Sequence, residues 1–474
     1  MEDELMIENM TAENMTADYV TSEYLKRCQA NERFRSVMST SHIPASFRNA
    51  FELLPRPFFA DRKAMDVLGS DLKSIFDIII SLPERLFNDD INKYCSVIGL
   101  DEQRTALISR LRNVEPPRSG RADLYRDGSA FKLLEFNVNT GIGGAETVEV
   151  NRALMADEPF TGFAREFNID YTDTMAAGAG RLRGAAATVS GSREPVIAAI
   201  ETDGGFSGWK DNFRAIRDSM AEYGVRLVPG ELGQLKQKNG RVYLDGKPLD
   251  LILRYFMVEQ LIDDVSGQAA YEMICRMHEQ GNLVLHTPPA SHLFNDKATL
   301  ALLSDRRYRN SFSGTERELI DRILPWTRLL REGWTQFNDE RVDLMSFSIE
   351  HQQNLILKPG AGFSGIGVVA GWETESGEWE KLLRRNAGGP FIIQHRVDST
   401  PEAIVDPDSG RLEHVAPVWG VFFSENGFDG GFIRAASHRG AVTNFATNPK
   451  TSIIGGPRTR RTGLFTCDGQ RGRA

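Results

Sequence analysis

A predicted β-hairpin in the segment RADLYRDGSAFKLLEFNVN constrains this chain more than any other feature. Two short strands flank a glycine-containing turn, which is typical of antiparallel pairing. If the loop comprises residues 128–130, Asp123 lies directly opposite Glu135 and Arg121 directly opposite Asn137. Directly opposed residues share one face of a sheet, and a slip of one residue would separate them. The hairpin therefore predicts two carboxylates, an amide and a guanidinium side by side.

This group of side chains predicts a cation site. Two neighbouring carboxylates repel each other, so the pair must be protonated, ion-paired or bound to a cation. Asp123, Glu135 and Asn137 together suit Mg²⁺ carrying a polyphosphate. Taken alone, an ordinary hairpin with a solvated polar face is the more common explanation. The other motifs of the chain favour the cation site.

Composition bounds the class of protein. A chain of 474 residues with 41% hydrophobic content can hold two or three globular domains or lobes. A net charge of −9 without a basic stripe argues against a primary role in nucleic-acid binding. No stretch approaches a membrane span, and the acidic first residues are unlike a signal peptide. The cysteines are Cys28, Cys95, Cys275 and Cys467. Their spacing is not that of a metal site, and it favours an enzyme of the reducing cytoplasm.

The pattern of apolar and breaker residues predicts a mixed α+β or α/β architecture. Residues 1–115 are expected to be mainly helical, and residues 116–190 carry the hairpin. Residues 191–294 follow the order strand, Gly-rich loop, helix, strand, which is typical of a Rossmann-like unit. Residues 295–456 begin with helices and continue as strands. The Arg- and Gly-rich residues 457–474 are predicted to be a disordered tail.

A second candidate site is the glycine-rich segment LKPGAGFSGIG. Lys358 lies at a strand end, where it could reach nucleotide phosphates, and Ser364 adds a hydroxyl. Glycine lets backbone amides approach phosphate oxygens closely; the glycines are Gly360, Gly362, Gly365 and Gly367. The spacing is neither a Walker A loop nor a dinucleotide fingerprint. A glycine-rich hairpin without a ligand remains the alternative.

Three weaker motifs complete the set. The segment FIIQHRV predicts a strand followed by a polar stretch, Gln394 to Val397, that could recognise adenine; alone, a plain buried strand is favoured. Arg434 follows two glycines on a late strand and could brace a phosphoryl group or a carboxylate. A surface strand arginine is equally compatible with that pattern. The loop at residues 203–208 suits either a tight turn, which we favour, or a site for an acidic substrate.

Taken together, RADLYRDG, FKLLEFNVNT, LILKPGAGFSG, FIIQ and GGFIR resemble the ATP-grasp synthetase domain of glutathionylspermidine synthase. They also resemble the wider group of ATP-grasp ligases in which the metal-binding element precedes the lysine and glycine loop. The resemblance covers about residues 116–456. It implies an ATP-grasp fold over residues 116–190 and 295–456, with residues 191–294 as a Rossmann-like pre-ATP-grasp domain.

The resemblance also implies roles for individual residues. Asp123, Glu135 and Asn137 would bind Mg²⁺, and Lys358 would contact the nucleotide. Residues 360–367 would form the lid over the phosphates. The other implied contacts are the adenine hinge at Gln394 to Val397 and the charge-stabilising arginines Arg121 and Arg434.

The chain departs from the family's pattern in two places. The first ATP-binding lysine, expected some 30 to 40 residues before Lys358, is not evident, and Arg328 is the predicted substitute. The lid sequence Gly-Ala-Gly-Phe-Ser is less charged than the family's. The segment PASHLFNDKATLALL is similar to the Asn- and Lys-containing helix start that precedes the lysine region in that group. No amidase domain with a catalytic cysteine precedes the hairpin.

We therefore expect an ATP- and Mg²⁺-dependent carboxylate–amine ligase that forms an amide through an acyl phosphate. Its expected partners are a small-molecule or peptide carboxylate and an amine, with neither a nucleic acid nor a membrane. An inactive ATP-grasp scaffold or nucleotide-binding regulator is the alternative, motivated by the missing lysine. A dinucleotide-dependent oxidoreductase using residues 194–230 is a third, weaker hypothesis. The sequence specifies neither the substrates nor the oligomeric state.

Overall fold

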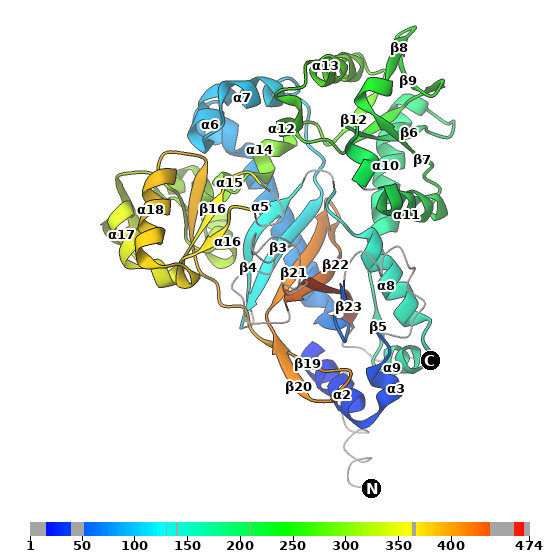
Figure 1. The fold of residues 1–474 in the computed structure, drawn as a ribbon, viewed down its shortest axis with the longest axis vertical. Coiled ribbons are helices and arrows are strands. Elements are labelled where there is room, and N and C mark those ends of the chain that lie inside the picture. Colours follow the sequence, from blue (N-terminus) through cyan, green and yellow to red (C-terminus); the bar gives the residue numbers. More distant parts are fainter. Residues whose placement is uncertain are drawn as a thin grey trace.

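A computed structural model describes residues 16–38, 52–128, 130–138, 141–208, 210–362, 366–436 and 459–468. A large mixed sheet occupies the centre of the molecule (Figure 1), and its main strand order is β1-β23-β22-β21-β3-β4. Strands β2 and β5 also pair with β23. The strands are β1 (Glu52–Leu53), β2 (Phe58–Asp61), β3 (Gly120–Asp127), β4 (Ala130–Asn137), β5 (Ile169–Asp170), β21 (Pro417–Ser424), β22 (Gly427–Ala436) and β23 (Thr459–Cys467).

Strand β23 contradicts the prediction of a disordered tail for residues 459–467; the rest of the predicted tail, 457–458 and 469–474, lies outside the described residues. The strand runs antiparallel to β22 and parallel to β1 and β2. Successive side chains of a strand point to opposite faces, and here both faces are covered: Leu464 packs into one core cluster and Phe465 into another. The Arg- and Gly-rich composition concealed this alternation. Gly463 has no room for a side chain, because a Cβ there would lie 1.5 Å from Asn151 Oδ1.

The long helix α5 (Arg62–Phe87) covers one face of the central sheet, where it contacts β21 and β22. Its buried residues recur at helical spacing, for example Leu68, Leu72 and Ile75, which is the pattern of an amphipathic helix. The helix approaches the sheet closely, since a Cβ at Gly69 would lie 2.3 Å from the backbone nitrogen of Phe428. Helix α5, which belongs to the segment predicted as N-terminal and mainly helical, therefore packs into the core of the central sheet.

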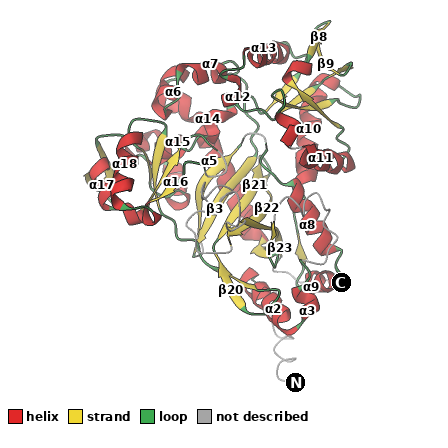
Figure 2. Cartoon of the chain, in the orientation of Figure 1, coloured by secondary structure: helices red, strands yellow, loops and turns green. Residues whose placement is uncertain are grey.

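Helices on the other side of the sheet enclose a second core that includes Phe465. Figure 2 shows how helices flank the strands throughout the molecule. These helices are α2 (Ala17–Ala30), α3 (Glu32–Arg35), α8 (Ala145–Met155), α9 (Glu158–Glu166) and α10 (Thr174–Ser190). At the top of the sheet lie α6 (Ile91–Ile98) and α7 (Glu102–Ser109).

A second, four-stranded sheet forms the predicted Rossmann-like unit, with parallel pairing in the order β12-β11-β6-β7. The Gly-rich loop after β6 is a βα turn, in which Asp203 Oδ1 accepts a 2.8 Å hydrogen bond from the backbone of Gly233. Its strands are β6 (Ile197–Glu201), β7 (Leu227–Glu231), β11 (Leu251–Arg254) and β12 (Val284–His286). Its helices are η2 (Gly205–Gly208), α11 (Lys210–Glu222), η3 (Leu232–Gln234), α12 (Val258–Leu261) and α13 (Val265–Glu279), and a small sheet contains β8 (Lys236–Lys238), β9 (Arg241–Leu244) and β10 (Lys247–Pro248).

A third sheet, in the order β13-β18-β16-β17, forms a smaller lobe at the left of Figure 1. Its strands are β13 (Thr327–Leu329), β16 (Leu355–Pro359), β17 (Val369–Ala370) and β18 (Phe391–His395), with a hairpin of β14 (Trp334–Phe337) and β15 (Glu340–Asp343). The helices in and before it are α14 (Ser291–Asn295), α15 (Ala298–Ser304), η4 (Arg306–Ser311), α16 (Gly314–Ile323), α17 (Leu344–Glu350), η5 (Gln352–Asn354), η6 (Gly371–Glu373) and α18 (Ser376–Asn386).

The chain leaves this lobe after β18. A hairpin of β19 (Glu402–Val405) and β20 (Leu412–Val415) follows, and β21 and β22 then join the central sheet. The expected unit at 295–456 is thus divided between two sheets, and its last residues, 437–456, lie outside the described part of the chain. This arrangement places β21 beside the predicted hairpin and β22 next to β21, although both strands are far along the sequence.

Candidate functional site

The hairpin β3–β4 has the predicted register at its polar end. Arg121 pairs with Asn137, and Asp123 pairs with Glu135, in an antiparallel ladder. The four side chains predicted to meet are thus aligned on neighbouring strands at the end that faces the other two lobes (Figure 1). The prediction of their pairing is confirmed.

A β-bulge produces this register by a route that the sequence did not indicate. Near the turn Asp127 pairs with Ala130, so the tip is one residue tighter than the expected three-residue loop. The ladder then shifts between Asp123 and Leu124, which leaves Leu134 as the extra residue on β4. Without the bulge, Asp123 would face Leu134 and the carboxylate of Glu135 would point to the other face of the sheet.

Asp123 is the centre of a buried charge network. Its Oδ1 accepts a 2.7 Å hydrogen bond from Arg121 Nε, and its Oδ2 accepts one of 2.6 Å from Arg434 Nη2. The Asn137 amide also donates to Oδ2, at 3.2 Å. Burial alone would raise the pKa of Asp123, but Arg121 and Arg434 outweigh it and hold this pKa well below its usual range. The carboxylate is ionised and shared between two cations.

The network also fixes which groups of the hairpin remain available to a ligand. A carboxylate can only accept hydrogen bonds, so Asn137 must turn its NH₂ group toward Asp123 and keep Oδ1 as an acceptor. Glu135 uses Oε2 in an ion pair and keeps Oε1. One amide oxygen and one carboxylate oxygen are therefore the acceptors that β4 can offer.

Lys297 is the partner of Glu135, and the sequence analysis missed it as a site residue. Its Nζ lies 2.9 Å from Glu135 Oε2, and its side chain is 7% exposed. Burial lowers its pKa, but the attraction of Glu135 is stronger, so the net result is a raised pKa. Two residues earlier, Asn295 Oδ1 accepts a 3.0 Å hydrogen bond from the backbone of Val138, which docks this turn on the end of β4. The sequence signal for Lys297 is the motif FNDK, which lies in the segment similar to the Asn- and Lys-containing helix start of the ATP-grasp group.

Lys358 lies in the same region, at the end of β16, and is also buried. Its Nζ donates a 2.7 Å hydrogen bond to Gln394 Oε1, and Gln394 in turn donates to Thr327 Oγ1 at 3.0 Å. Burial, reinforced by the neighbouring charge of Lys297, lowers the pKa of Lys358 to about 8, although Glu135 acts against this shift. Because the amide of Gln394 is neutral, this hydrogen bond does not balance the positive charge that Lys358 carries when protonated.

The glycine loop begins directly beside Lys297. Its first glycine, Gly360, accepts a 2.9 Å hydrogen bond from the backbone nitrogen of Lys297. A Cβ at Gly360 would lie 2.5 Å from Asp296 Oδ1, so this close contact requires glycine. Gly362 has a φ of +142°, which also favours glycine. Ser364 and Gly365, both predicted to contact phosphate, lie outside the described residues.

Arg328 does not substitute for the missing lysine, contrary to the prediction. In β13, Thr327 pairs with Gln394 and Arg328 pairs with Ile393, so Arg328 points to the face opposite Lys358. Its guanidinium donates to the carbonyl oxygens of Ser304, at 2.8 Å, and Gln336, at 3.0 Å. Arg328 therefore has a structural role, and Lys297 is the second buried cation beside Lys358.

The proposed adenine hinge, Gln394 to Val397, straddles the end of β18. Gln394 is buried and points toward Lys358, whereas Val397 is half-buried in the segment that leaves the lobe. Arg396, between them, stacks on the ring of Trp372 at 4.5 Å. The hinge stays a prediction.

Three guanidinium groups surround one aromatic ring at the end of the central sheet. Arg121, Arg434 and Arg461 lie 5.2, 5.6 and 5.8 Å from the ring centre of Phe432. Cations stack favourably on aromatic faces, and Asp123 is the carboxylate that pairs with two of them. The arrangement gathers positive charge beside the hairpin.

The donor set fits Mg²⁺ only in part. No group of three or more His, Cys, Asp or Glu side chains suited to a metal ion occurs among the described residues. Glu135 Oε1 and Asn137 Oδ1 are hard oxygen ligands of the kind that Mg²⁺ takes, while both oxygens of Asp123 are already hydrogen-bonded. Such a pair would hold the ion together with phosphate oxygens and water. We therefore revise the predicted role of Asp123 from ligand to organiser of the site.

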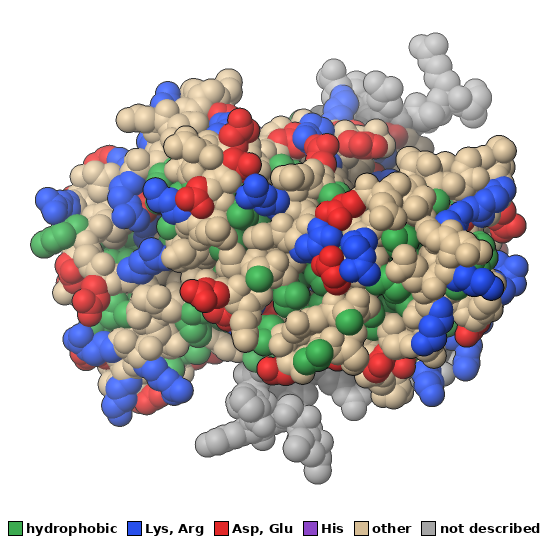
Figure 3. Space-filling model, turned by 90° about the horizontal axis from the view of Figure 1, so that it is seen from above, with side chains coloured by type: hydrophobic (Ala, Val, Ile, Leu, Met, Phe, Trp, Pro, Cys, Tyr) green, Lys and Arg blue, Asp and Glu red, His purple; other side chains and the backbone are tan. Residues whose placement is uncertain are grey.

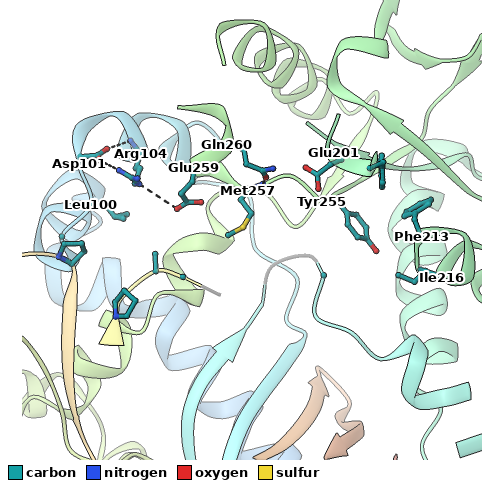
Figure 4. Close-up of a pocket in the computed structure, with 18 residues that line it drawn as sticks. Leu100, Asp101, Arg104, Glu201, Phe213, Ile216, Tyr255, Met257, Glu259 and Gln260 are labelled. Atoms are coloured by element: carbon teal, nitrogen blue, oxygen red, sulfur yellow. Dashed lines mark hydrogen bonds and ion pairs between the residues drawn. The ribbon is translucent and has the colours of Figure 1, made fainter. Parts of the chain in front are cut away.

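A cavity of about 780 Å³ lies where the central sheet, the parallel unit and the small lobe meet (Figure 4). The glycine loop contributes Pro359, Ala361 and Gly362 to its wall, and Gly141 follows the end of β4. Residues of the α6–α7 connection lie on one side, and residues of the parallel unit lie on the other. The N-terminal helices α6 and α7 thus contribute part of the cavity wall.

Solved structures that are similar to this chain include the following two. The structure of a glutathione synthetase-like effector from Globodera pallida, in its apo form, has a TM-score of 0.51 and 13% sequence identity, and the match covers 87% of this chain and 90% of the effector. A candidate gamma-glutamylcysteine synthetase from Methylobacillus flagellatus gives a TM-score of 0.41 at 14% identity, over 80% of this chain and 86% of that protein. The first likeness shows that the α+β fold is shared along most of both chains.

No protein-family model and no curated protein sequence matches the chain. Among the described residues, no helix has both the length and the apolar character needed to cross a membrane. Figure 3 shows one face of the molecule with basic and acidic side chains intermingled.

Proposed function

We propose that this protein is an ATP-dependent carboxylate–amine ligase with an ATP-grasp type of active site. The observation that carries the proposal is a pair of buried lysines at the glycine loop: Lys297, which is ion-paired with Glu135 and hydrogen-bonded to Gly360 through its backbone, and Lys358, at the strand end before the loop. Two buried lysines need anionic partners, and one carboxylate is too little for both. A polyphosphate chain would supply the remaining negative charge.

In this proposal the two lysines bind the nucleotide phosphates as point charges. Gln394 holds Lys358 in place through a 2.7 Å hydrogen bond, and the backbone of Gly360 holds the Lys297 turn against the glycine loop. The glycine loop closes over the phosphates with its backbone amides, including those at Ser364 and Gly365. The segment from Gln394 to Val397 recognises the base.

Mg²⁺ would supply a counter-charge for the phosphate oxygens, held by Glu135 Oε1 and Asn137 Oδ1. Asp123 acts through its neighbours: it orients the Asn137 amide and fixes Arg121 and Arg434. These two guanidiniums would stabilise charge on the reacting carboxylate and phosphate, because they are already fixed and need little reorganisation. The fold supports this division of roles between the sheet and the small lobe.

The reaction joins a carboxylate and an amine. Phosphoryl transfer from ATP activates the carboxylate as an acyl phosphate; the amine then attacks the acyl carbon and loses a proton, and phosphate leaves. No nucleophilic side chain is required. The fold shared with a glutathione synthetase-like protein supports this reaction class, and the substrates proposed are a small-molecule or peptide acid and an amine.

The test is an ADP-release assay that crosses a panel of amino acids and short peptides with a panel of amines. We expect one combination to stimulate ADP release by the wild-type protein, and Glu135→Ala to abolish the stimulation. The matched control Glu413→Ala removes an exposed carboxylate on β20 and should leave the rate unchanged. Unchanged turnover in Glu135→Ala would contradict the proposal.

The same samples separate this function from that of an inactive nucleotide-binding scaffold. Calorimetric titration with Mg²⁺ and a non-hydrolysable ATP analogue should give saturable binding in both cases. Binding without ADP release across the whole panel would favour the scaffold. Absence of binding would exclude both.

A further inference from the structure

The cavity at the junction of the three lobes has two unlike walls. Its volume, about 780 Å³, lies in the range of pockets that enclose small organic molecules. One end adjoins the glycine loop at Gly362 and the end of the hairpin at Gly141. The other end is lined by residues at the strand ends of the parallel unit, among them Glu201 and Tyr255. A molecule bound there would touch both the proposed reaction centre and the parallel unit.

The wall at the parallel unit is aromatic. Phe206 and Phe213 are in edge-to-face contact, with ring centres 4.8 Å apart, and Phe213 lies 5.9 Å from Tyr255. Ile216, one turn after Phe213 on α11, extends the apolar surface. Figure 4 shows Phe213, Tyr255 and Ile216 grouped on one side of the cavity. This wall would bury an apolar or aromatic body.

Glu201 stands beside the aromatic wall, at the end of β6. It accepts a 2.8 Å hydrogen bond from the backbone of Thr202, and it forms no ion pair with any of the described residues, although the charge of the buried Arg254 acts on it. A Cβ at Gly205 would lie 2.1 Å from the Glu201 side chain, so glycine at this position makes room for the carboxylate. The fold thus keeps an anionic group at the edge of an aromatic surface.

The remaining charges of the cavity wall leave it acidic. Asp101 and Glu259 are also carboxylates, and Arg104 is the cation among the lining residues. Arg104 pairs with Asp101 and lies 4.0 Å from Glu259. The buried Arg254, whose guanidinium donates to the Thr287 carbonyl at 2.8 Å, offsets part of the charge from below. With Arg254 included, carboxylates still outnumber guanidiniums.

We propose that this cavity binds an organic ammonium ion: an amine with an apolar, preferably aromatic, body and no carboxylate of its own. Glu201 pairs with the ammonium group, and the aromatic wall receives the body and adds cation–π attraction. The inference rests on the proposed function in one respect, because this amine would be the substrate that attacks the activated acid. The acidic wall would repel an amino acid carboxylate, and the apolar wall offers a second ammonium group no partner.

The experiment is a calorimetric titration of the full chain with phenethylamine, with and without Mg²⁺ and a non-hydrolysable ATP analogue. Phenylpropionate, phenylalanine and 1,4-diaminobutane serve as an anion, a zwitterion and a diamine of related size. We expect saturable binding of phenethylamine that is at least tenfold tighter than that of the other three. Equal or tighter binding of any of them, or no saturable binding of phenethylamine in either condition, would overturn the proposal.

Variants locate the site. Glu201→Gln keeps the side-chain shape and the hydrogen bond from Thr202 but removes the charge, and it should weaken phenethylamine binding at least tenfold. Phe213→Leu should weaken it about threefold, as expected for loss of one aromatic contact. Glu413→Gln, far from the cavity on β20, should have no effect. Unchanged affinity in Glu201→Gln would overturn the assignment.

The two proposals can fail separately. Lys358→Met should lose nucleotide binding and keep phenethylamine binding in the absence of nucleotide, whereas Glu201→Gln should do the reverse. If the wild-type chain binds phenethylamine but no nucleotide, the ligase function is wrong and the ammonium site stands. If it binds nucleotide but not phenethylamine, the ammonium site is wrong.

Discussion

Two regions of this molecule differ in where the counter-charges of their carboxylates come from. In the central sheet, Asp123 is held between Arg121 and Arg434, and Glu135 pairs with Lys297. At the end of the parallel sheet, by contrast, Glu201 has only a threonine as its hydrogen-bond partner. The first region supplies its own cations in ion pairs, whereas Glu201 forms no ion pair with any described residue, although the charge of Arg254 acts on it.

This difference indicates the sign of the charge on the ligand that each region would bind. The central region contains cations beyond its two carboxylates, because Arg461 and Lys358 lie there as well. The central region is therefore suited to binding an anion. The cavity contains more acidic than basic side chains and is prepared for a cation. A ligase that joins an activated acid to an amine needs both kinds of site next to each other.

The largest expected effect comes from removing the internal counter-charge of the central region. Asp123→Asn would leave two buried guanidiniums without their carboxylate, and we expect a loss of about 3–5 kcal/mol in the free energy of unfolding. Urea denaturation followed by circular dichroism measures it. The control is Asp66→Asn, which breaks an exposed pair with Arg62 and should change stability by less than about 1 kcal/mol. Equal effects of the two substitutions would contradict the comparison.

A second prediction concerns Lys297. Lys297→Met should weaken binding of the ATP analogue by about 10- to 100-fold, the range for one lost charged hydrogen bond. The same variant should bind Mn²⁺ without nucleotide about fivefold more tightly, because Glu135 no longer shares its charge with an ammonium group. Mn²⁺ binding is followed by paramagnetic resonance. Lys381→Met on the exposed surface of α18 is the control, and opposite shifts in the two affinities are the signature to look for.

A third prediction uses the lowered pKa of Lys358. With a pKa of about 8, the free amine predominates at pH 8.5, and a bound polyphosphate would raise this pKa and recharge the group. Nucleotide binding at pH 8.5 should therefore take up about 0.75 of a proton, whereas at pH 6.5, where the group is already protonated, uptake should vanish. Titration calorimetry in buffers of different ionisation enthalpy measures the uptake. Equal uptake at pH 8.5 and at pH 6.5 in the wild-type protein would refute this assignment.

The smallest expected effect lies in the cavity. Arg104→Met removes the guanidinium among the lining residues, and we expect phenethylamine to bind about two- to threefold more tightly, as for other partly exposed charges. The gain should fade at high salt because such charges are screened. Weaker binding in this variant would mean that Arg104 orients Glu259 rather than opposing the ligand's charge.

The sequence predicted the parts of this molecule that depend on local alternation. The paired positions Asp123 and Glu135 followed from the turn, and the parallel unit followed from strand–loop–helix order. The bulge at Leu134 could not be predicted, because an extra residue in one strand leaves the alternation of polar and apolar residues ambiguous. The predicted loop was one residue too long, and the predicted strand lacked the extra residue of the bulge. These two errors cancelled at the pairing of Asp123 with Glu135.

The errors arose where distant segments decide the outcome. Lys297 and Lys358 belong to different elements that are distant in sequence. Spacing along the chain alone therefore pointed to Arg328 and not to Lys297. Only the strand register shows that Arg328 faces away from Lys358. Composition likewise concealed β23, whose burial depends on helices on both sides rather than on its own Arg-rich sequence.

The position of β23 has a consequence for how the molecule is made. Asp61 pairs with Cys467 across 406 positions of the chain, and β22 needs β23 to fill its free edge. During synthesis, therefore, α5 and the early strands leave the ribosome long before their last neighbour exists. Until it arrives, an unpaired strand edge and apolar side chains of both cores are exposed to other molecules. Chaperone capture of the nascent chain should persist until residues 459–467 have emerged.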